Sequence, residues 1–385
     1  MAAGMTAVNP GVLRWARERS GLSVQEAAAM LGKTADVISE WESGDSAPSY
    51  AQLEKVAYKL YKRPLAIFFF PEPPIEKDPK TEFRLLPLSE LEGLHRDTLL
   101  AVRQGLAYQD SLRELTGGTN PAGMRIFQEI NPKRFKSTEA LSTRARELLG
   151  VSLETQKSWD SIRDAFKIWR DAVESCGIFV FKRSFKQRDV SGFCLFDTEF
   201  PIIFINNGTS YSRQIFSLFH ELAHILYSIS GMTKEDNSYV DELPRTDKHL
   251  EVACNKFAAS LLVPDSEFTS RTKGKVASDD EIQNLAAEYK VSREVILRKF
   301  LDLGFVDQRQ YEQKARQWRQ EFESRGRTGG GNYYATQATY LGRKFLGLAF
   351  SCYYSGRCTL QDLAHHLNVR ARNIEGLEEF VTRGN

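Results

Sequence analysis

The sequence predicts an α+β protein with an all-α amino-terminal part, a central part that carries a small β-sheet, and a helical carboxyl-terminal region. Three observations indicate this arrangement. Short apolar patterns of helical period fill residues 13–60. Stretches rich in branched and aromatic residues lie between 177 and 207. Helical patterns then return and continue to the end. A length of 385 residues leaves room for more than one domain, each with its own core.

Charge and cysteine content narrow the class of protein. The chain has 52 basic and 50 acidic residues, so it has no overall attraction to nucleic acid or anionic membrane, and such binding needs a local patch. No apolar run is long enough to span a bilayer, and the first residues do not resemble a signal peptide. The five cysteines lack CxxC spacing, which favours free thiols. We therefore expect a cytoplasmic protein that does not bind membranes.

Four short helices are predicted in the amino-terminal part. Ser23 and Thr34 occupy positions typical of N-caps, and glycines follow the helical patterns where helices should end. The proline-marked passage PLAIFFFPEPPIEKDPK (64–80) then indicates a boundary or a packed linker. The predicted helices cover residues 13–21, 23–31, 34–44 and 49–60.

The central and carboxyl-terminal parts follow from a change of period. We expect strands at 177–183, 190–197 and 200–207, and a helix that starts near Ser210. Further helices are expected at 248–263, 279–303 and 307–324, and a flexible joint at 324–332. The predicted domains are a helix-rich domain at 1–70, a helical linker region at 71–175, a sheet-containing domain at 176–306 and a helical region at 307–385.

The stretch FSLFHELAHILY (216–227) carries the chemistry. On a helix, His220 and His224 lie one above the other and can offer both imidazoles to one metal ion. Glu221 projects beside them, where it can take a proton from a zinc-bound water. The alternative is that both histidines are core residues. The apolar stripe that includes Leu218 and Leu222 lies roughly opposite them, which favours the metal site.

Zinc needs a third protein ligand. Glu251 is the natural choice, because it shares a predicted helix face with Asn255, which is suited to orienting a ligand. His249 and Asp247 are rivals for this position, being one turn away. The alternative to a ligand role is that Glu251 is simply an acidic residue in the first turn of a helix.

These motifs resemble the ImmA/IrrE metallopeptidase family. The resemblance rests on SRQIFSLFHELAHIL followed by ExxCNxFAAxLLxP, in which Cys254 replaces the usual alanine and Val263 the usual methionine. It implies a zincin-like domain that holds Zn²⁺ with His220, His224 and Glu251, with Glu221 as general base. It also implies a protein substrate of the repressor type or a neighbouring-gene product, whose cleavage switches on phage, mobile-element, toxin-antitoxin or stress genes.

Residues 13–60 are similar to the phage-repressor type of helix-turn-helix, with a recognition helix at 34–43. In that type the recognition helix enters the major groove of DNA. The candidate DNA contacts are Lys33, Thr34, Ala35, Asp36 and Ser39. This recognition stretch contains Asp36, Glu40, Glu42 and Asp45 and no basic residue. The carboxylates at its outward positions, Asp36 and Glu40, would face the phosphates and be repelled. Arg14, Arg17, Arg19 and Lys33 are the residues expected to compensate. The rival use is docking of a partner protein.

The sequence therefore predicts a zinc metallopeptidase fused to a helix-turn-helix domain, acting on a regulatory protein. Two alternatives remain open. One is a DNA-binding regulator whose metal domain senses a signal without turnover, and the other is an antitoxin-like binding protein. The tail at 359–381 also has a helix-turn-helix pattern, for which a small packing unit is the preferred interpretation.

Overall fold

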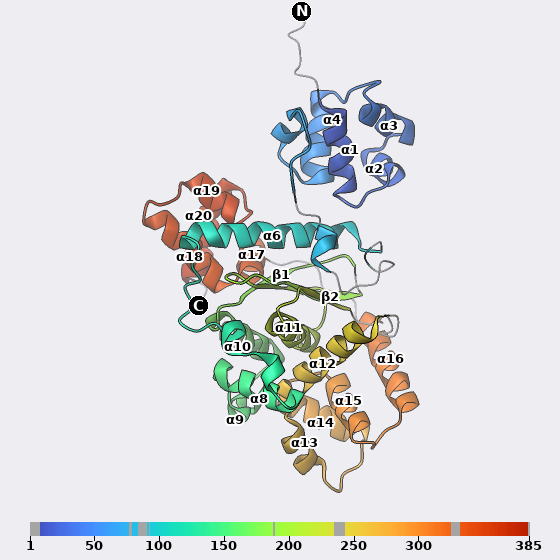
Figure 1. Cartoon of the computed structure of the whole chain (residues 1–385), viewed down its shortest axis with the longest axis vertical. Helices are drawn as coiled ribbons and strands as arrows, with labels where there is room; N and C mark the ends of the chain where they lie inside the picture. The colour runs from blue at the N-terminus through green and yellow to red at the C-terminus, as the bar shows by residue number, and fades with distance from the viewer. Residues whose placement is uncertain are drawn as a thin grey trace, which may run out of the picture. The chain divides into compact units, whose positions relative to one another are not determined.

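The computed structural model describes residues 8–76, 79–83, 91, 93–187, 189–234, 243–324 and 332–383 (Figure 1). The described residues pack as two compact units, the first ending at Arg103 and the second beginning at Gln104. The predicted α+β class is confirmed. No helix among the described residues is long and apolar enough to cross a membrane.

The first unit is built from short helices around a common core. Its helices are α1 (Pro10–Glu18), α2 (Val24–Leu31), α3 (Ala35–Ser43) and α4 (Tyr50–Glu54). The bounds of α2 and α3 agree with the predicted ones within one residue, whereas α1 lies three residues earlier than predicted. Ser23 caps α2 through a reciprocal bond with Glu26, and Gly32 ends it in the left-handed conformation. The fourth predicted helix changes character, because α4 continues as the π-helix η1 (Lys55–Tyr61), which the 3₁₀ turn η2 (Leu65–Phe69) follows. The turn η3 (Pro79–Glu82) comes next.

Helix α6 (Arg96–Thr116) crosses the boundary between the units in sequence. Short helices then precede the sheet of the second unit, namely α7 (Ile126–Glu129), η4 (Pro132–Arg134), α8 (Thr138–Leu149), α9 (Leu153–Ser158) and α10 (Ile162–Ser175). Residues of these helices share one core with the sheet and the helices after it. The boundaries of the four predicted domains stay predictions.

The sheet confirms the three predicted strands and adds a fourth. The strands β1 (Phe179–Arg183), β2 (Val190–Leu195), β3 (Ile202–Asn206) and β4 (Gly231–Lys234) lie in the order β1-β3-β2-β4. β1 pairs with β3 in parallel, and β2 pairs antiparallel with both β3 and β4. β4 escaped prediction because its sequence, GMTK, is short and not apolar.

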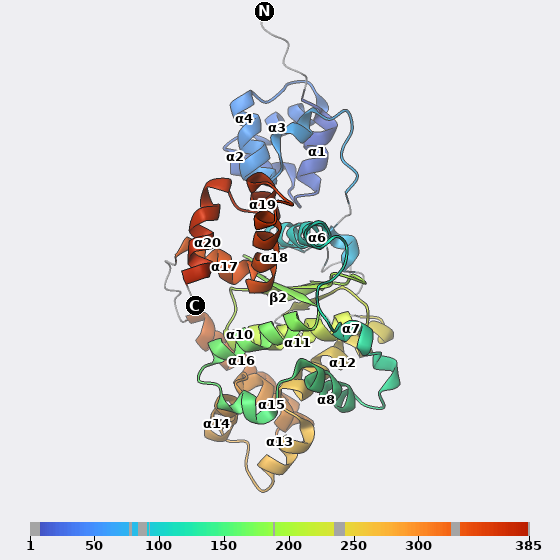
Figure 2. The ribbon, with the colours of Figure 1, turned by 90° about the vertical axis from the view of Figure 1, so that its left-hand side faces the viewer.

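Both faces of the sheet are covered, which explains why its strands read as nearly continuous apolar runs. On one face lies α11 (Tyr211–Leu226), and on the other lies the second part of α6 (Figures 1 and 2). Tyr108 of α6 stacks on Phe181, with ring centroids 4.4 Å apart. Gly105 lets the helix approach, because a Cβ there would meet the side chains of Ile202 and Leu195 at 3.0 Å.

The remaining helices follow β4. They are α12 (Arg245–Leu262), α13 (Asp265–Thr272), α14 (Asp279–Tyr289), α15 (Arg293–Asp302) and α16 (Gln308–Ser324). The single helix predicted at 279–303 is wrong, because Lys290 adopts a φ of 55° and Ser292 caps a new helix. Residues 325–331 of the predicted joint lie outside the described residues. The last elements are α17 (Tyr333–Leu341), α18 (Arg343–Tyr354), α19 (Leu360–His366), η6 (Ala371–Asn373) and α20 (Ile374–Arg383).

Candidate metal centre and helix-turn-helix surface

Helix α11 is held between the sheet and α12, and almost all of it is buried. The helix begins beside Ser210, as predicted, and Ser210 is its N-cap, accepting a hydrogen bond from the backbone N–H of Arg213. The Ser217 hydroxyl donates to that of Ser191 on β2 at 3.0 Å, which fixes the helix against the sheet. The apolar stripe lies in the core, and the two histidines are buried as well, facing α12. The burial of His220 and His224 therefore does not mean that they pack as core residues, because both face α12 and not the apolar stripe.

Three side chains from α11 and α12 converge on one point. The Nε2 atoms of His220 and His224 are 3.0 Å apart, and each lies 3.3 Å from a carboxylate oxygen of Glu251. A tetrahedral zinc ion with bonds of about 2.0–2.1 Å holds its ligand atoms about 3.3 Å from one another. All three side chains are buried, and they form a group of ligand atoms within 4.8 Å of one another. The donor set and its spacing thus fit zinc.

A neighbouring amide orients the first histidine. Nδ1 of His220 lies 3.0 Å from Oδ1 of Asn255, which is an acceptor, so Nδ1 carries the proton and Nε2 keeps its lone pair for a metal. This is the arrangement that the spacing of Glu251 and Asn255 on one helix face suggested. Asn255 thus supports the ligand without belonging to the convergent group.

Charge at the centre also suits a cation. Burial would raise the pKa of Glu251, but the adjacent His224 and His220 lower it below its ordinary value, so the carboxylate is anionic. Burial opposes protonation of His224, whereas Cys254 and Glu251 beside it raise its pKa above the usual value. Burial raises the pKa of the Cys254 thiol itself. A cation bound at this point would therefore meet one carboxylate and two imidazoles, with a neutral thiol beside them.

Glu221 lies beside the convergent group but does not belong to it. Its side chain is fully buried, and Oε1 accepts a hydrogen bond from the Thr233 hydroxyl on β4. Its other oxygen, Oε2, has no hydrogen-bond partner among the described residues. Burial and the nearby Glu221 raise the pKa of the Cys194 thiol. A buried carboxylate oxygen with no partner is a group held ready for a ligand or a proton.

Two alternative ligands lie outside the ligand group, and three residues that the sequence did not predict lie near it. Neither Asp247 nor His249 belongs to the ligand group found among the described residues. No sequence pattern pointed to Thr233, or to Cys194 beside Glu221. Gly231 was also missed, although a Cβ there would meet the His224 ring at 2.5 Å. All of these lie on strands β2 and β4, and β4 itself was not predicted.

A cavity of about 520 Å³ opens beside the centre. Asn255, which contacts His220, lines it, as does Phe216, whose ring centroid lies 6.4 Å from that of His220. The apolar part of its wall consists of Phe216, Val252, Ala259, Phe268, Val295 and Leu303. A cavity of this size accommodates several peptide residues rather than one side chain.

In the first unit, the candidate DNA contacts lie together at the start of α3. Lys33, Thr34, Asp36 and Ser39 are exposed, and Ala35 is partly buried. Thr34 stands at the N-cap, but its hydroxyl makes no capping bond. These residues form one accessible surface, which is what a contact to DNA or to a partner protein requires.

Two charged residues, one on α1 and one on α3, bond to each other and do not contribute charge to the exposed surface of α3. Glu42 is buried, and its carboxylate accepts a bidentate pair of hydrogen bonds from Arg17 at 2.7 and 2.9 Å. Arg14 donates to the backbone oxygen of Glu42. The expectation that Arg17 compensates for acidic charge at the DNA-facing surface is therefore wrong, because Arg17 and Glu42 neutralise each other between α1 and α3. Asp36 and Glu40 remain exposed.

The described residues thus form a unit of short helices, followed by an α+β unit in which two histidines and a glutamate converge. Comparison with known families agrees. Residues 173–301 match the IrrE N-terminal-like domain of peptidase family M78, and residues 13–60 match the helix-turn-helix family. The resemblance inferred from the sequence is thus confirmed. No curated protein matches the chain.

Proposed function

We propose that the chain is a zinc-dependent peptidase fused to a helix-turn-helix domain, and that it cleaves a regulatory protein. The observation that carries this proposal is the convergence of His220, His224 and Glu251, with ligand atoms 3.0 to 3.3 Å apart. We assign these three side chains as the zinc ligands, and Asn255 as the group that orients His220. The peptidase family match supports the same reaction class.

Zinc bound there would supply a Lewis acid and would bring the pKa of a bound water near 7. The chain's own groups do the rest. The Thr233 hydroxyl holds one oxygen of Glu221, so the free Oε2 is the atom that accepts a proton from the attacking water. The same carboxyl group then donates that proton to the leaving amine. Burial of Glu221 excludes bulk water from this exchange.

The cavity lined by Asn255 and Phe216 supports a peptide substrate. It begins at a residue that contacts His220 and continues over an apolar wall, so an extended segment can lie with its backbone near the metal. Such an arrangement suits a protein substrate in which a short segment is unfolded. A helix-turn-helix repressor or a neighbouring-gene product in the cytoplasm is the substrate class we propose, on the strength of the family resemblance.

The test is co-expression of the chain with each neighbouring gene product, followed by detection of a truncated band. The Glu221→Gln variant should keep about one zinc per chain and lose cleavage, because zinc is bound by other residues. His224→Gln should lose both zinc and cleavage. His249→Gln serves as the matched control and should lose neither, since His249 lies outside the ligand group. Full cleavage by Glu221→Gln would contradict the proposed mechanism.

A second function, DNA binding through α3, is supported by the exposed cluster around Thr34 and by the helix-turn-helix match. Asp36 and Glu40 oppose it electrostatically. A gel shift with DNA from upstream of the gene, repeated at several salt concentrations, tests it. Asp36→Asn combined with Glu40→Gln should strengthen the shift if α3 enters the groove. An unchanged or absent shift would favour docking of a partner protein instead.

A further inference from the structure

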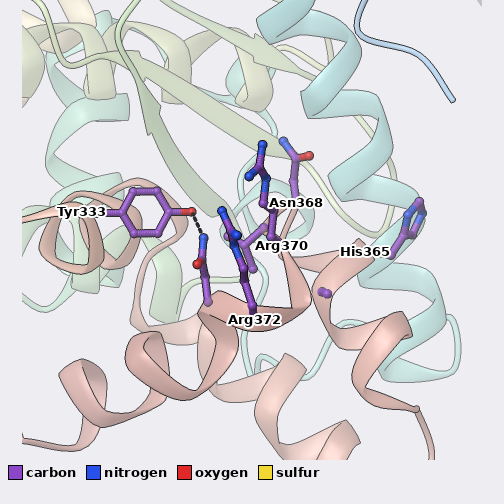
Figure 3. Close-up of a pocket in the computed structure, with 8 residues that line it drawn as sticks. Tyr333, His365, Asn368, Arg370 and Arg372 are labelled. Carbon is purple, nitrogen blue, oxygen red and sulfur yellow. Dashed lines mark hydrogen bonds between the residues drawn. The ribbon is translucent and has the colours of Figure 1, made fainter. Parts of the chain in front are cut away.

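A second hollow lies in the carboxyl-terminal helices, in a region to which neither family match extends. Its volume is about 660 Å³, which is within the range of small-ligand sites. Figure 3 shows Tyr333 on one side, with its hydroxyl directed toward the arginines, and Asn368 between them and His365. The polar residues that line it are Tyr333, His365, Asn368, Arg370, Arg372 and Asn373.

The connection between α19 and α20 builds this hollow. The chain leaves α19, takes the left-handed conformation at Asn368 with a φ of 51°, and makes the turn η6 before α20 begins. This path presents Arg370 and Arg372 on the same side. Across from them, the Tyr333 hydroxyl accepts a hydrogen bond of 3.1 Å from Nδ2 of Asn373. This hydrogen bond thus holds Tyr333 beside the segment that carries the two arginines.

The charged side chains that line the hollow are positive. No carboxylate is among the described residues that line it. Within the described part of the chain, neither Arg370 nor Arg372 forms an ion pair, whereas Arg383 of the adjoining helix pairs with Glu379. Glu375 follows in the first turn of α20 but does not line the hollow. Two exposed guanidinium groups without carboxylate partners attract an anion, and phosphate suits their planar geometry.

We propose that this hollow binds a nucleotide unit, with Arg370 and Arg372 on its phosphate and Tyr333 stacked on its base. Tyr333 is 45% exposed, so its ring offers a face on which a base can stack. Nδ2 of Asn368 donates to Oε1 of Gln104, so the Oδ1 atom of Asn368 is the one that can accept a hydrogen bond from a base edge. A bare phosphate or an acidic peptide would use the arginines but not the ring. The nucleotide is either free or part of a single strand, since both present the same phosphate and base.

The experiment measures binding of a fluorescein-labelled oligothymidine to the full chain by anisotropy, with ATP, inorganic phosphate and polyglutamate as competitors. Arg370→Ala with Arg372→Ala should weaken binding at least tenfold. It should also reduce the slope of log K against log salt by about 0.7, because the two arginines together neutralise one phosphate of the strand. The matched control is Arg309→Ala with Arg316→Ala, which removes two exposed arginines from α16 and should change neither quantity.

The ring is tested separately. Tyr333→Ala should weaken binding roughly 5-fold to 150-fold, the equivalent of about 1–3 kcal/mol of stacking. Tyr333→Phe keeps the ring and removes only the hydrogen bond to Asn373, so it should bind nearly as well as the wild type. Competition by ATP would assign the site to a free nucleotide, and competition by unlabelled strand alone would assign it to nucleic acid.

Three results would overturn the proposal. The first is absence of saturable binding to both the oligothymidine and ATP. The second is an equal effect of the two arginine double variants. The third is competition by polyglutamate that matches competition by the strand, which would make the hollow a general anion site. Circular dichroism of each variant separates loss of binding from loss of fold.

Discussion

Gly231 shows how one atom can control the candidate metal centre. It opens β4 where the strand passes the ring of His224, and a Cβ there would lie 2.5 Å from that ring. Neither the strand backbone nor a buried imidazole can yield easily. The residue at this position therefore decides where His224 points.

We expect Gly231→Ala to lower zinc affinity about 10-fold to 100-fold, the range seen when a ligand loses its support. Overpacking should also cost about 1–3 kcal/mol of unfolding free energy. Gly347→Ala is the control, because a Cβ at Gly347 meets nothing within 4 Å. Competitive zinc titration and thermal unfolding measure both effects. Unchanged zinc affinity in Gly231→Ala would show that the ring has room to move.

Lys182 on β1 is a buried cation with an unusual environment. Burial, aided by Arg170 and Arg163, lowers the pKa of its ammonium group to about 7. Its Nζ lies 4.4 Å from the centroid of the Phe166 ring and 5.0 Å from that of Tyr211. The rings favour the cation and so oppose part of this shift.

This shift predicts a pH dependence of stability. The unfolded lysine has a pKa of about 10.4, so between about pH 7 and pH 10 the unfolded chain holds a proton that the folded chain has lost. The unfolding free energy therefore rises with pH in that window and is lowest below pH 7. Lys182→Met should remove about 1–3 kcal/mol of this rise, whereas the exposed Lys167→Met should leave it intact. Denaturant unfolding at several pH values tests the difference, and parallel curves for both variants would contradict it.

At the scale of elements, α1 and α3 are joined through Glu42, which forms a close ion pair with Arg17 and a longer one, of 3.9 Å, with Arg14. The side chains of Arg17 and Glu42 are 11% and 5% exposed, and their two hydrogen bonds tie the carboxyl-terminal end of α3 to α1. Removing one partner leaves the other charge buried without compensation.

We expect Glu42→Ala to cost about 3 kcal/mol and to abolish any function of the α3 surface. Glu40→Ala, on the exposed side of the same helix, should cost less than about 0.5 kcal/mol. Hydrogen exchange over residues 8–61 reports this change locally, apart from the rest of the chain. Equal protection in the two variants would show that the pair contributes nothing to the unit.

The end of α15 forms part of the cavity beside the candidate metal centre. Leu303 is 42% exposed and belongs to the apolar wall, so a charge there alters the cavity without disturbing the core. Leu303→Asp should lower kcat/KM for a cleaved peptide about tenfold while zinc content stays the same, because the ligands are on other helices. Val276→Asp, 78% exposed and outside the cavity, is the control. Identical kinetics of the two variants would remove the cavity from substrate binding.

At the scale of the whole molecule, metal binding should be measurable as stability. The ligands come from α11 and α12, which belong to one core with α8 and α10. An ion that binds only the folded chain stabilises it by about 2.7 kcal/mol at a free concentration one hundred times its Kd.

A chelator should therefore lower the Tm of the wild type and of Glu221→Gln by several degrees. It should leave the Tm of His224→Gln unchanged, because that variant has lost a ligand. Differential scanning calorimetry with and without chelator makes the comparison. If the chelator left the Tm of the wild type unchanged, no metal would contribute to the stability of the fold.

The sequence by itself determined the features that depend on local order. Caps such as Ser23 and Ser210, the three apolar strands and the histidine spacing on one helix are all set by neighbours a few residues away. The motif pair around His220 and Glu251 was readable because each half lies within a single helix, and the family match agrees with it. Helix breaks such as Lys290 and the short strand β4 have no strong local signal and were missed.

Only the tertiary structure decided which distant groups meet. It brought Glu251, and neither His249 nor Asp247, to the two imidazoles, and it placed Thr233 on Glu221. It also turned Glu42 inward onto Arg17. The physical reason is that these choices depend on packing between segments far apart in sequence. A one-dimensional pattern records which residues can interact, whereas burial and close packing select the ones that do.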